Sequence, residues 1–291
     1  MFKVYVAILT TIAVWSASFL IISRLLAVVT PMELTILRFI PAALICLAYI
    51  AARHATGVWA SLRKNLWLFI LYSVLLIPVY NGFLYYGLKD VSSGLAALIV
   101  GGSPVCTYLL AMSIGDEGFN RKKFLGIVVA FCGLLVAIIL GSEKTFAAGH
   151  LLYVAAVFGA MLSAAGQGVI ARHLLMRHPL PVVMGLAIAL GCLPLLFFID
   201  GPFISRAASL DVSVWLGIAF LTIASTIGGH VGWFYALRRL PTTNVVIFIN
   251  LIPFVTMFLG HFFLQEHINA WLVAGGVLLV SGIVTTTRSP G

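Results

Sequence analysis

Charged side chains are scarce in this sequence. Asp, Glu, Lys and Arg together make up 9% of its 291 residues, whereas hydrophobic residues make up 62%. A soluble globular domain has about 25% charged and about 45–50% apolar residues, because charged groups must cover its surface. The composition therefore excludes a soluble protein and predicts an integral membrane protein, whose surroundings are the lipid bilayer.

Negative charge is scarcer than positive charge. Eight Asp and Glu oppose seventeen Lys and Arg, which gives a formal net charge of +9. Such an excess can indicate nucleic-acid binding, but no basic stretch is interleaved with aromatic residues as on a nucleic-acid surface. Membrane proteins concentrate Lys and Arg in cytoplasmic loops. We therefore expect the excess to mark one face of the membrane, and we expect no nucleic-acid partner.

Metal-binding and catalytic motifs are missing as well. The cysteines lie singly in apolar runs, with no CxxC pair or Cys/His cluster, and are expected to be small core residues. They are Cys46, Cys106, Cys132 and Cys192. No Ser/His/Asp arrangement, HExxH, Walker loop or GxGxxG stands in the structural context that it requires. We therefore expect no metal, no cofactor and no catalytic residue.

Long apolar runs are what the sequence does contain. A helix needs roughly 20 apolar residues to cross about 30 Å of hydrocarbon. Charges and turn residues mark off ten such runs, at approximately 2–23, 31–52, 66–87, 92–114, 123–141, 148–171, 180–199, 213–237, 241–264 and 268–287. The connections are too short to hold a soluble domain. The first run is too long for a signal peptide and is expected to remain as the first helix.

The distribution of Lys and Arg orients these spans. With the N-terminus in the cytoplasm, twelve of the seventeen lie on the cytoplasmic side and four lie outside. The twelve are Lys3, Arg53, Arg63, Lys64, Arg121, Lys122, Lys123, Arg172, Arg177, Arg238, Arg239 and Arg288. The four are Arg24, Lys89, Lys144 and Arg206, and Arg38 lies within the second span. This bias in short loops predicts that both termini are cytoplasmic.

The two halves of the chain resemble each other. At an offset of 149, the fourth and fifth spans match the ninth and tenth at ten identical positions without a gap. The matches include Tyr86 with Tyr235, Pro104 with Pro253, Glu117 with Glu266, Asn120 with Asn269, and Gly133 with Gly282. We therefore divide the chain into residues 1–145 and 146–291. Five spans per half predict an inverted repeat, which is typical of secondary transporters, although channels and receptors can also be duplicated.

A set of short motifs runs through both halves. The first half carries Thr30-Pro31, Leu37-Arg38-Phe39, Tyr86-Gly87-Leu88, Ser93-Gly94-Leu95-Ala96-Ala97, Pro104, Glu117, Gly126 and Gly133. The second half carries Tyr235, Pro253, Glu266, Gly275 and Gly282. This pattern resembles the EamA-type module of the drug/metabolite transporter superfamily over essentially the whole chain.

The resemblance implies an all-α polytopic membrane protein with ten transmembrane helices in two inverted five-helix repeats. It also implies a location in the bacterial inner membrane, cytoplasmic termini, and the export of amino acids or other small metabolites. Within that superfamily, the sequence is also similar to the aromatic amino-acid exporters.

Carboxylates are absent from the interior of the spans. All eight Asp and Glu lie at or near span ends, whereas proton- or Na⁺-driven carriers often bury a carboxylate in the membrane. This favours facilitated transport, or weak coupling through His230 or His261, over a carboxylate proton relay. Glu117 and Glu266 are expected to cap the helices that follow them or to pair with nearby cations.

Arg38 is the cation that lies clearly inside a span. It could extend to the outer interface, pair with Glu33, or bind the carboxylate of a substrate, and the sequence leaves these alternatives open. A carrier of sugar phosphates or nucleotides needs several buried Lys or Arg to bind a polyanion. A single arginine therefore argues against a polyanionic substrate.

Polar and aromatic side chains inside the spans form the candidate substrate site. Some lie four residues apart and so share a helix face, as Ser163 and Gln167 do. The candidate substrate-binding residues are Trp15, Ser18, Tyr80, Asn81, Tyr85, Ser103, Tyr108, Ser163, Gln167, His230, Trp233 and Asn250. The candidate hinge or interrupted-helix positions are Pro78, Pro104 and Pro253. Helix packing is the alternative for each residue alone, whereas the set together favours a cavity.

The sequence thus predicts a secondary transporter that exports small neutral or zwitterionic metabolites, such as amino acids and among them aromatic ones, by alternating access. Aromatic walls would stack on an apolar side chain, and Asn, Ser, Gln or His would fix the polar groups. The alternative is a membrane-embedded enzyme acting on a lipid or another membrane substrate, for which only His230 and His261 offer a reactive group. The short loops leave little surface for a receptor, and we expect no obligate protein partner.

Overall fold

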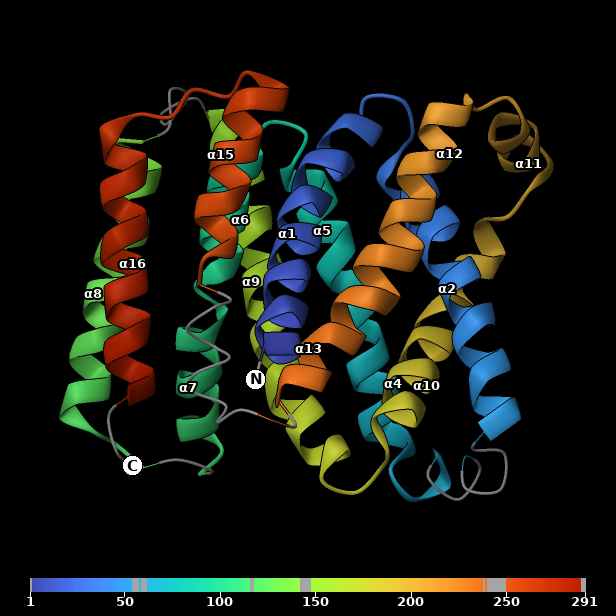
Figure 1. Ribbon diagram of the computed structural model, residues 1–291, viewed down its shortest axis with the longest axis horizontal. Coiled ribbons are helices and arrows are strands. Elements are labelled where there is room, and N and C mark those ends of the chain that lie inside the picture. The colour runs from blue at the N-terminus through green and yellow to red at the C-terminus, as the bar shows by residue number, and fades with distance from the viewer. Residues whose placement is uncertain are drawn as a thin grey trace.

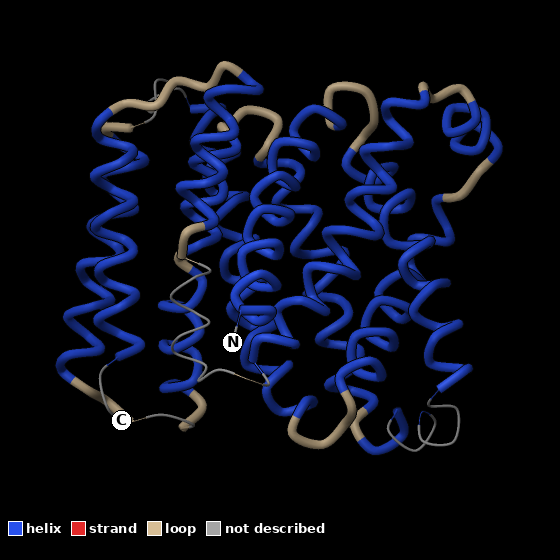
Figure 2. The backbone as a smooth tube through the Cα atoms, in the orientation of Figure 1, coloured by secondary structure: helices blue, strands red, loops and turns tan. Residues whose placement is uncertain are grey.

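Helices make up the fold in the part of the chain that the structure describes. The computed structural model describes residues 2–53, 58, 62–115, 118–141, 148–237, 239 and 250–288. Within these ranges the chain forms helices and short connections and no strand (Figure 2). The prediction of an all-α protein is confirmed.

Each of the ten predicted spans contains one or more helices. In the first half these are α1 (Phe2–Leu25), α2 (Pro31–Arg53), α4 (Leu66–Val74), η1 (Leu75–Val79), α5 (Tyr80–Gly87), α6 (Ser93–Gly101), α7 (Ser103–Ser113) and α8 (Arg121–Ile139). In the second half they are α9 (Ala148–Leu175), α10 (Leu180–Cys192), η2 (Leu193–Phe198), α12 (Val212–Ala219), η3 (Phe220–Gly228), α13 (Gly229–Leu237), α15 (Ile252–Leu264) and α16 (Ala270–Arg288). A short further helix, α11 (Gly201–Ala208), lies between the seventh and eighth spans.

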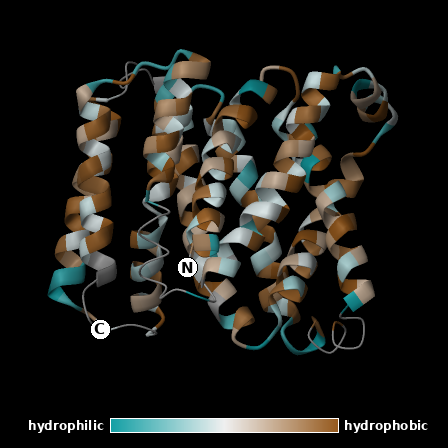
Figure 3. Cartoon of the chain, viewed as in Figure 1, coloured by the Kyte–Doolittle hydropathy of each residue, from teal (hydrophilic) through white to brown (hydrophobic). Residues whose placement is uncertain are grey.

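These helices are long and apolar enough for a membrane protein. Eight continuous segments qualify as membrane spans by length and hydropathy, and α15 and residues Ala270–Thr285 of α16 are shorter apolar helices. Hydrophilic residues gather toward the two ends of the bundle, while hydrophobic residues cover the helices between them (Figure 3). The chain is therefore a multi-pass membrane protein.

Helices of the two halves pack in corresponding pairs. α5 packs against α9 as α13 packs against α1, and α7 packs against α9 as α15 packs against α1. α2 packs against its own counterpart α10, and α8 packs against its counterpart α16. α1 and α9 run in opposite directions through the bundle (Figure 1). This exchange of partners is what an inverted repeat produces.

α8 and α16 lie side by side at one edge of the bundle (Figure 1). Glycines bring their backbones into direct contact. A Cβ on Gly133 would lie 2.5 Å from the Leu279 nitrogen and 2.6 Å from the Gly275 carbonyl oxygen. Small residues at a crossing let membrane helices approach closely. Gly275 is likewise at this crossing, since a Cβ there would lie 2.6 Å from the Gly133 carbonyl oxygen.

Three spans are irregular near their middles. The fourth span breaks at Gly102, between α6 and α7. The third and eighth spans contain the π-helical segments η1 and η3. The offset of 149 carries residues 75–79 onto 224–228, so the two π segments lie at corresponding places in the halves. Because a π-helical turn disturbs the regular hydrogen bonding of the backbone, side chains must satisfy carbonyl groups there.

Candidate functional site

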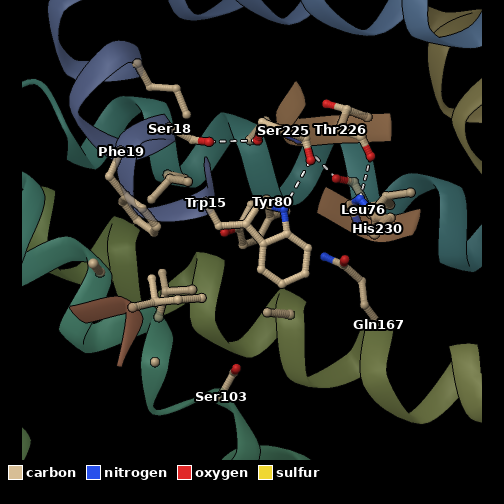
Figure 4. Close-up of a pocket in the computed structure, with 18 of the residues that line it drawn as sticks. Trp15, Ser18, Phe19, Leu76, Tyr80, Ser103, Gln167, Ser225, Thr226 and His230 are labelled. Atoms are coloured by element: carbon tan, nitrogen blue, oxygen red, sulfur yellow. Dashed lines mark hydrogen bonds between the residues drawn. The ribbon is translucent and has the colours of Figure 1, made fainter. Parts of the chain in front are cut away.

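A cavity of about 300 Å³ lies at the centre of the bundle, and we call it the central cavity. The middle parts of eight of the predicted spans line it, from α1 to α15. Nine of the predicted site residues are among its lining: Trp15, Ser18, Tyr80, Asn81, Ser103, Pro104, Gln167, His230 and Pro253. Figure 4 shows Trp15, Ser103 and Gln167 pointing toward this space from three different helices. Residues of both halves therefore meet at one place.

Arg38 reaches the wall of the central cavity from α2. Its Nη1 donates to the Tyr85 hydroxyl at 2.9 Å. Its Nε donates to Thr226 Oγ1 at 3.0 Å, and its Nη2 donates to Ser225 Oγ at 3.4 Å. The guanidinium carbon also lies 4.8 Å from the centre of the Phe39 ring. All four partners are neutral, so the guanidinium is fixed in place without an opposing charge.

Among the described residues, no carboxylate pairs with Arg38. Glu33 pairs instead with Arg206 of α11, with Oε1 2.7 Å from Nε. The second oxygen of Glu33 accepts a hydrogen bond from the Thr30 nitrogen at the start of α2. The sequence alternative of a Glu33–Arg38 pair is therefore wrong. So is the alternative of an arginine extended to the outer interface, because its hydrogen bonds hold it at the cavity.

Trp15 and Ser18 connect α1 to η3 beside the cavity (Figure 4). The Trp15 Nε1 donates to the Ser225 carbonyl at 3.1 Å, and Ser18 Oγ donates to Ser225 Oγ at 2.7 Å. The Trp15 ring meets the His230 ring edge-on, with 5.4 Å between centroids. Gly229 is required here, because a Cβ at that position would overlap the Trp15 indole nitrogen. These contacts place an aromatic wall next to a row of hydroxyl groups.

Asn81, Ser163 and Gln167 stabilise the π-helical segment η1. Asn81 Nδ2 donates to two carbonyl oxygens of η1, at 3.0 and 3.1 Å. From α9, Ser163 Oγ and Gln167 Nε2 both donate to the Leu75 carbonyl, at 2.8 and 3.1 Å. Pro78 lies within η1 and contributes no N–H to the backbone ladder. The amide nitrogens of Asn81 and Gln167 thus have structural partners, and both residues line the cavity.

Pro104 and Pro253 lie at helix starts, and both line the central cavity. Pro104 is the second residue of α7, and Pro253 is the second residue of α15. A Cβ on Gly101, at the end of α6, would come within 3.1 Å of the Pro253 ring. The break in the fourth span and the start of α15 therefore meet at the wall of the central cavity.

Three predicted substrate-binding residues lie behind the cavity wall. Tyr85 is fully buried and contacts Arg38 through its hydroxyl. Ser163 is hydrogen-bonded to η1. Trp233 lies beside Trp15, with 6.2 Å between ring centroids. These residues support the lining rather than form it.

Tyr108 and Asn250 lie away from the cavity. The Tyr108 hydroxyl donates to the Gly118 carbonyl at 2.9 Å, and the Lys123 ammonium lies 4.8 Å from the centre of its ring. Tyr108 therefore belongs to the end of the bundle where α7 meets α8. Asn250 is buried in the turn that precedes α15.

His230 and His261 are the titratable groups that the sequence suggested for coupling. His230 lines the central cavity, with Nδ1 2.6 Å from the Thr226 carbonyl oxygen. Because a carbonyl only accepts, Nδ1 carries the proton and Nε2 is the nitrogen left for a solute. His261 is exposed on α15, and its Nδ1 lies 3.0 Å from the Glu266 carbonyl oxygen. Of these two histidines, His230 is thus the one placed to meet a substrate.

Glu266 caps a helix of the other half. Its two carboxylate oxygens accept from the backbone nitrogens of Ser93 and Gly94, at 2.7 and 3.2 Å, at the start of α6. The expectation that it caps the following helix is wrong, because Asn269 provides the side-chain acceptor at the start of α16. Glu117 lies outside the described residues.

Ser225, Phe19 and Phe39 also line the cavity and are not among the site residues predicted from the sequence. Ser225 lies in η3, where no proline marks the change from α- to π-helix. The repeat contains a usable signal, because the offset carries the proline-bearing segment η1 onto residues 224–228. Phe39 follows Arg38 directly, and its position depends on how α2 packs.

The described residues contain no group of three His, Cys, Asp or Glu that could hold a metal ion. The polar and aromatic groups that line the site are one cation, aromatic rings, hydroxyls, amides and the imidazole of His230. Such a set can bind and orient a small polar molecule with an apolar part. The sequence matches the EamA-like transporter family model twice, over residues 2–139 and 151–288.

The chain belongs to the EamA-like transporter family. The resemblance to the EamA-type module of the drug/metabolite transporter superfamily is thus confirmed. A relative in Archaeoglobus fulgidus, named an uncharacterized transporter, is 28% identical over 98% of this chain and 99% of its own length. A "probable amino-acid metabolite efflux pump" of Salmonella typhimurium is 26% identical over 94% and 91%.

Two further matches concern an exporter and a solved structure. A "probable terminal-alkyne amino-acid exporter" of Streptantibioticus cattleyicolor is 27% identical over 73% of this chain and 70% of its own. A protein crystal structure matches with a TM-score of 0.65 and 20% identity, over 97% of this chain and 95% of that one, and so shares the fold. The family and the relatives' names indicate a membrane transporter rather than an enzyme.

Proposed function

We propose that this EamA-like transporter exports amino acids or closely related small metabolites across the bacterial inner membrane. The observation that carries the proposal is Arg38, a cation at the wall of the central cavity with only neutral partners. A guanidinium binds a carboxylate through paired, charge-assisted hydrogen bonds. The names of the relatives from Salmonella typhimurium and Streptantibioticus cattleyicolor support the same class of cargo.

The rest of the cavity suits the side chain of such a molecule. Trp15, Phe19 and Phe39 offer aromatic surface beside Arg38. Aromatic rings stack well on an apolar or aromatic side chain. The amide oxygens of Asn81 and Gln167 and the hydroxyl of Ser103 offer polar contacts in the same cavity. An amino acid with an aromatic side chain would use all three kinds of contact.

We propose that transport occurs by alternating access, because residues of both halves line the central cavity. We propose that residues 1–145 and 146–291 rock against each other about the breaks at Gly102 and at the start of α15. In inverted-repeat transporters, such motion exposes one fixed site to each side in turn. The bias of Lys and Arg supports a cytoplasmic position for both termini.

Counterflow in proteoliposomes tests the proposal. Purified protein is reconstituted in liposomes loaded with one unlabelled compound, and uptake of its labelled form is measured for a panel of amino acids and their derivatives. We expect exchange of carboxylate-bearing members, and Trp15→Ala should reduce it. Trp67→Ala is the matched control, because Trp67 is 71% exposed and does not line the cavity. No exchange across the whole panel would overturn the proposal.

A further inference from the structure

A second cavity, of about 600 Å³, adjoins the central cavity. We call it the lateral cavity. It lies between α2, α10 and α13, and it shares Met184, Ile188, Thr226 and His230 with the central cavity. It extends from these residues to Arg239, just beyond the end of α13. The two cavities therefore share a wall, and a solute that passes it would follow one path from the middle of the bundle toward the end that carries most Lys and Arg.

Positive charge marks both ends of this path. Arg38 lines the central cavity and Arg239 lines the lateral cavity. The Arg239 guanidinium carbon lies 3.8 Å from the centre of the Tyr235 ring, and its Nη1 donates to the Tyr235 carbonyl at 3.4 Å. No Asp or Glu is among the described residues that line either cavity. The path thus carries two cations, each with neutral partners.

We propose that the transported species is a monoanion: an amino-acid derivative with a free carboxylate whose amine is acylated or replaced by a keto or hydroxyl group. This inference rests on the proposed export function and narrows its substrate class. A zwitterion would leave Arg38 and its own ammonium as two positive groups in one cavity, with a single carboxylate between them. A monoanion neutralises Arg38 and leaves no unpaired charge in the membrane interior, where such a charge is costly.

The remaining polar groups fit an acylated or replaced amine better than an ammonium. An ammonium has three N–H donors to satisfy. The amide nitrogens of Asn81 and Gln167 are already donating to η1, so their oxygens and the Nε2 of His230 are acceptors left in the cavity, and none of them carries the negative charge that an ammonium requires. One amide N–H or one hydroxyl can be satisfied by such single acceptors, and a keto oxygen can accept from Ser103, which lines the same cavity.

The same charge explains how export can proceed without a buried carboxylate. The cell interior is electrically negative, so a monoanion that moves outward alone is driven by the membrane potential. A tenfold outward concentration ratio corresponds to about 60 mV for one elementary charge. A zwitterion gains nothing from this potential because its net charge is zero. The protein therefore needs no proton or Na⁺ site to accumulate the exported anion outside.

The test compares matched compounds in wild-type proteoliposomes. The labelled probes are phenylalanine, N-acetylphenylalanine and phenyllactate, and a K⁺ gradient with valinomycin sets about 60 mV, interior negative. We expect efflux of the two anions to an external excess approaching tenfold, and little exchange of phenylalanine. Exchange of phenylalanine without the two anions would overturn the monoanion inference and leave the proposed function standing. If neither these three probes nor any member of the earlier panel were exchanged, the proposed function itself would be overturned.

The response to voltage tests the inference independently. Anion efflux that does not respond to the imposed potential would show that a cation moves with the substrate, and would overturn the inference of transport driven by the potential.

Arg239→Gln should lower the rate of anion efflux several-fold without removing it, because it weakens the attraction of the anion to the end of the lateral cavity that lies farthest from the central cavity. Arg121→Gln is the matched control, since Arg121 is an exposed arginine that lines neither cavity. Equal effects of the two substitutions would exclude the lateral cavity as the route.

Discussion

Arg38 concentrates the chemistry of the site in one side chain. It makes three hydrogen bonds to neutral hydroxyl groups. A hydrogen bond to a charged group contributes about 1.5–3 kcal/mol, so Arg38→Gln should raise the KM for a carboxylate substrate roughly 10- to 100-fold. The KM of Arg38→Lys should lie between those of the wild type and Arg38→Gln, because an ammonium keeps the positive charge but loses the planar array of N–H donors. Counterflow normalised to the amount of reconstituted protein measures KM.

Arg121→Gln serves as the control for this comparison, as it removes an exposed arginine at the start of α8. Its KM should equal that of the wild type. An unchanged KM in Arg38→Gln would contradict the role of Arg38 in binding the carboxylate.

Gly229 is a second position at which a substitution should change the site, because an added Cβ would collide with Trp15. A Cβ there would overlap the Trp15 indole nitrogen, which donates to the Ser225 carbonyl. Gly229→Ala should therefore displace the Trp15 ring and reduce transport several-fold. Gly82→Ala provides the comparison, because nothing lies within 4 Å of a Cβ at that exposed helical position. It should leave transport unchanged and stabilise the helix by up to about 1 kcal/mol. Equal transport by the two variants would show that the Trp15 position does not matter.

At the scale of helices, α8 and α16 form a pair that supports the bundle from outside the site. Neither helix contributes to the lining of the central cavity. A Cβ on Gly133 would come within 2.6 Å of two backbone atoms of α16. Gly133→Ala should therefore lower the free energy of unfolding by roughly 1–3 kcal/mol, with the KM of the folded protein unchanged.

Thermal unfolding in detergent measures this loss, with Gly149→Ala as the reference. A Cβ on Gly149 meets nothing within 4 Å, and this residue lies in a helix as well. An unfolding temperature of Gly133→Ala equal to that of the reference would contradict the close crossing.

The helices themselves were predictable because the backbone of a membrane-spanning segment must satisfy its own hydrogen bonds. A long apolar run therefore forms a helix. Each predicted apolar run contains one or more described helices, and the structure has a break at Gly102, two residues before Pro104. The sequence did not indicate η3, because a π-helical segment without proline looks like any other apolar run. The capping role of Glu266 was also missed, since its acceptors reach α6, 172 residues away in sequence.

For the whole molecule, the proposed rocking of the two halves would separate α6 from α15, which are packed together in the structure. A Cβ on Gly94 would lie 3.4 Å from Met257 Cβ, close to the spacing of about 3.5–4.5 Å in a disulfide. Gly94→Cys with Met257→Cys, in a background without the four native cysteines, should cross-link these helices on oxidation. Transport should then stop, and a reducing agent should restore it.

Each single cysteine variant is the control for the cross-link and should keep its transport on oxidation. Wild-type turnover with the bond fully formed would show that α6 and α15 need not part. In that case the proposed rocking of the two halves would be wrong.

Whole-molecule symmetry was visible in the sequence, but the partners of Arg38 were not. The repeat follows from Pro, Glu, Asn and Gly in register, which apolar composition does not produce. The contacts of Arg38 with Ser225 and Thr226 join residues that lie 187 and 188 positions apart in a chain of 291 residues. They depend on how α2 packs against η3, and no local pattern reports that packing. The sequence therefore identified Arg38 as unusual without identifying its environment.

Binding of a carboxylate in the central cavity can be measured directly. Ser103 lines this cavity, so Ser103→Cys in the background without native cysteines reports occupancy through its rate of alkylation. N-acetylphenylalanine and phenylalanine are each compared with the corresponding C-terminal amide. We predict that N-acetylphenylalanine slows alkylation in a concentration-dependent way and that its amide does not. Equal protection by carboxylates and amides, or protection by none of the four compounds, would contradict a carboxylate site at Arg38.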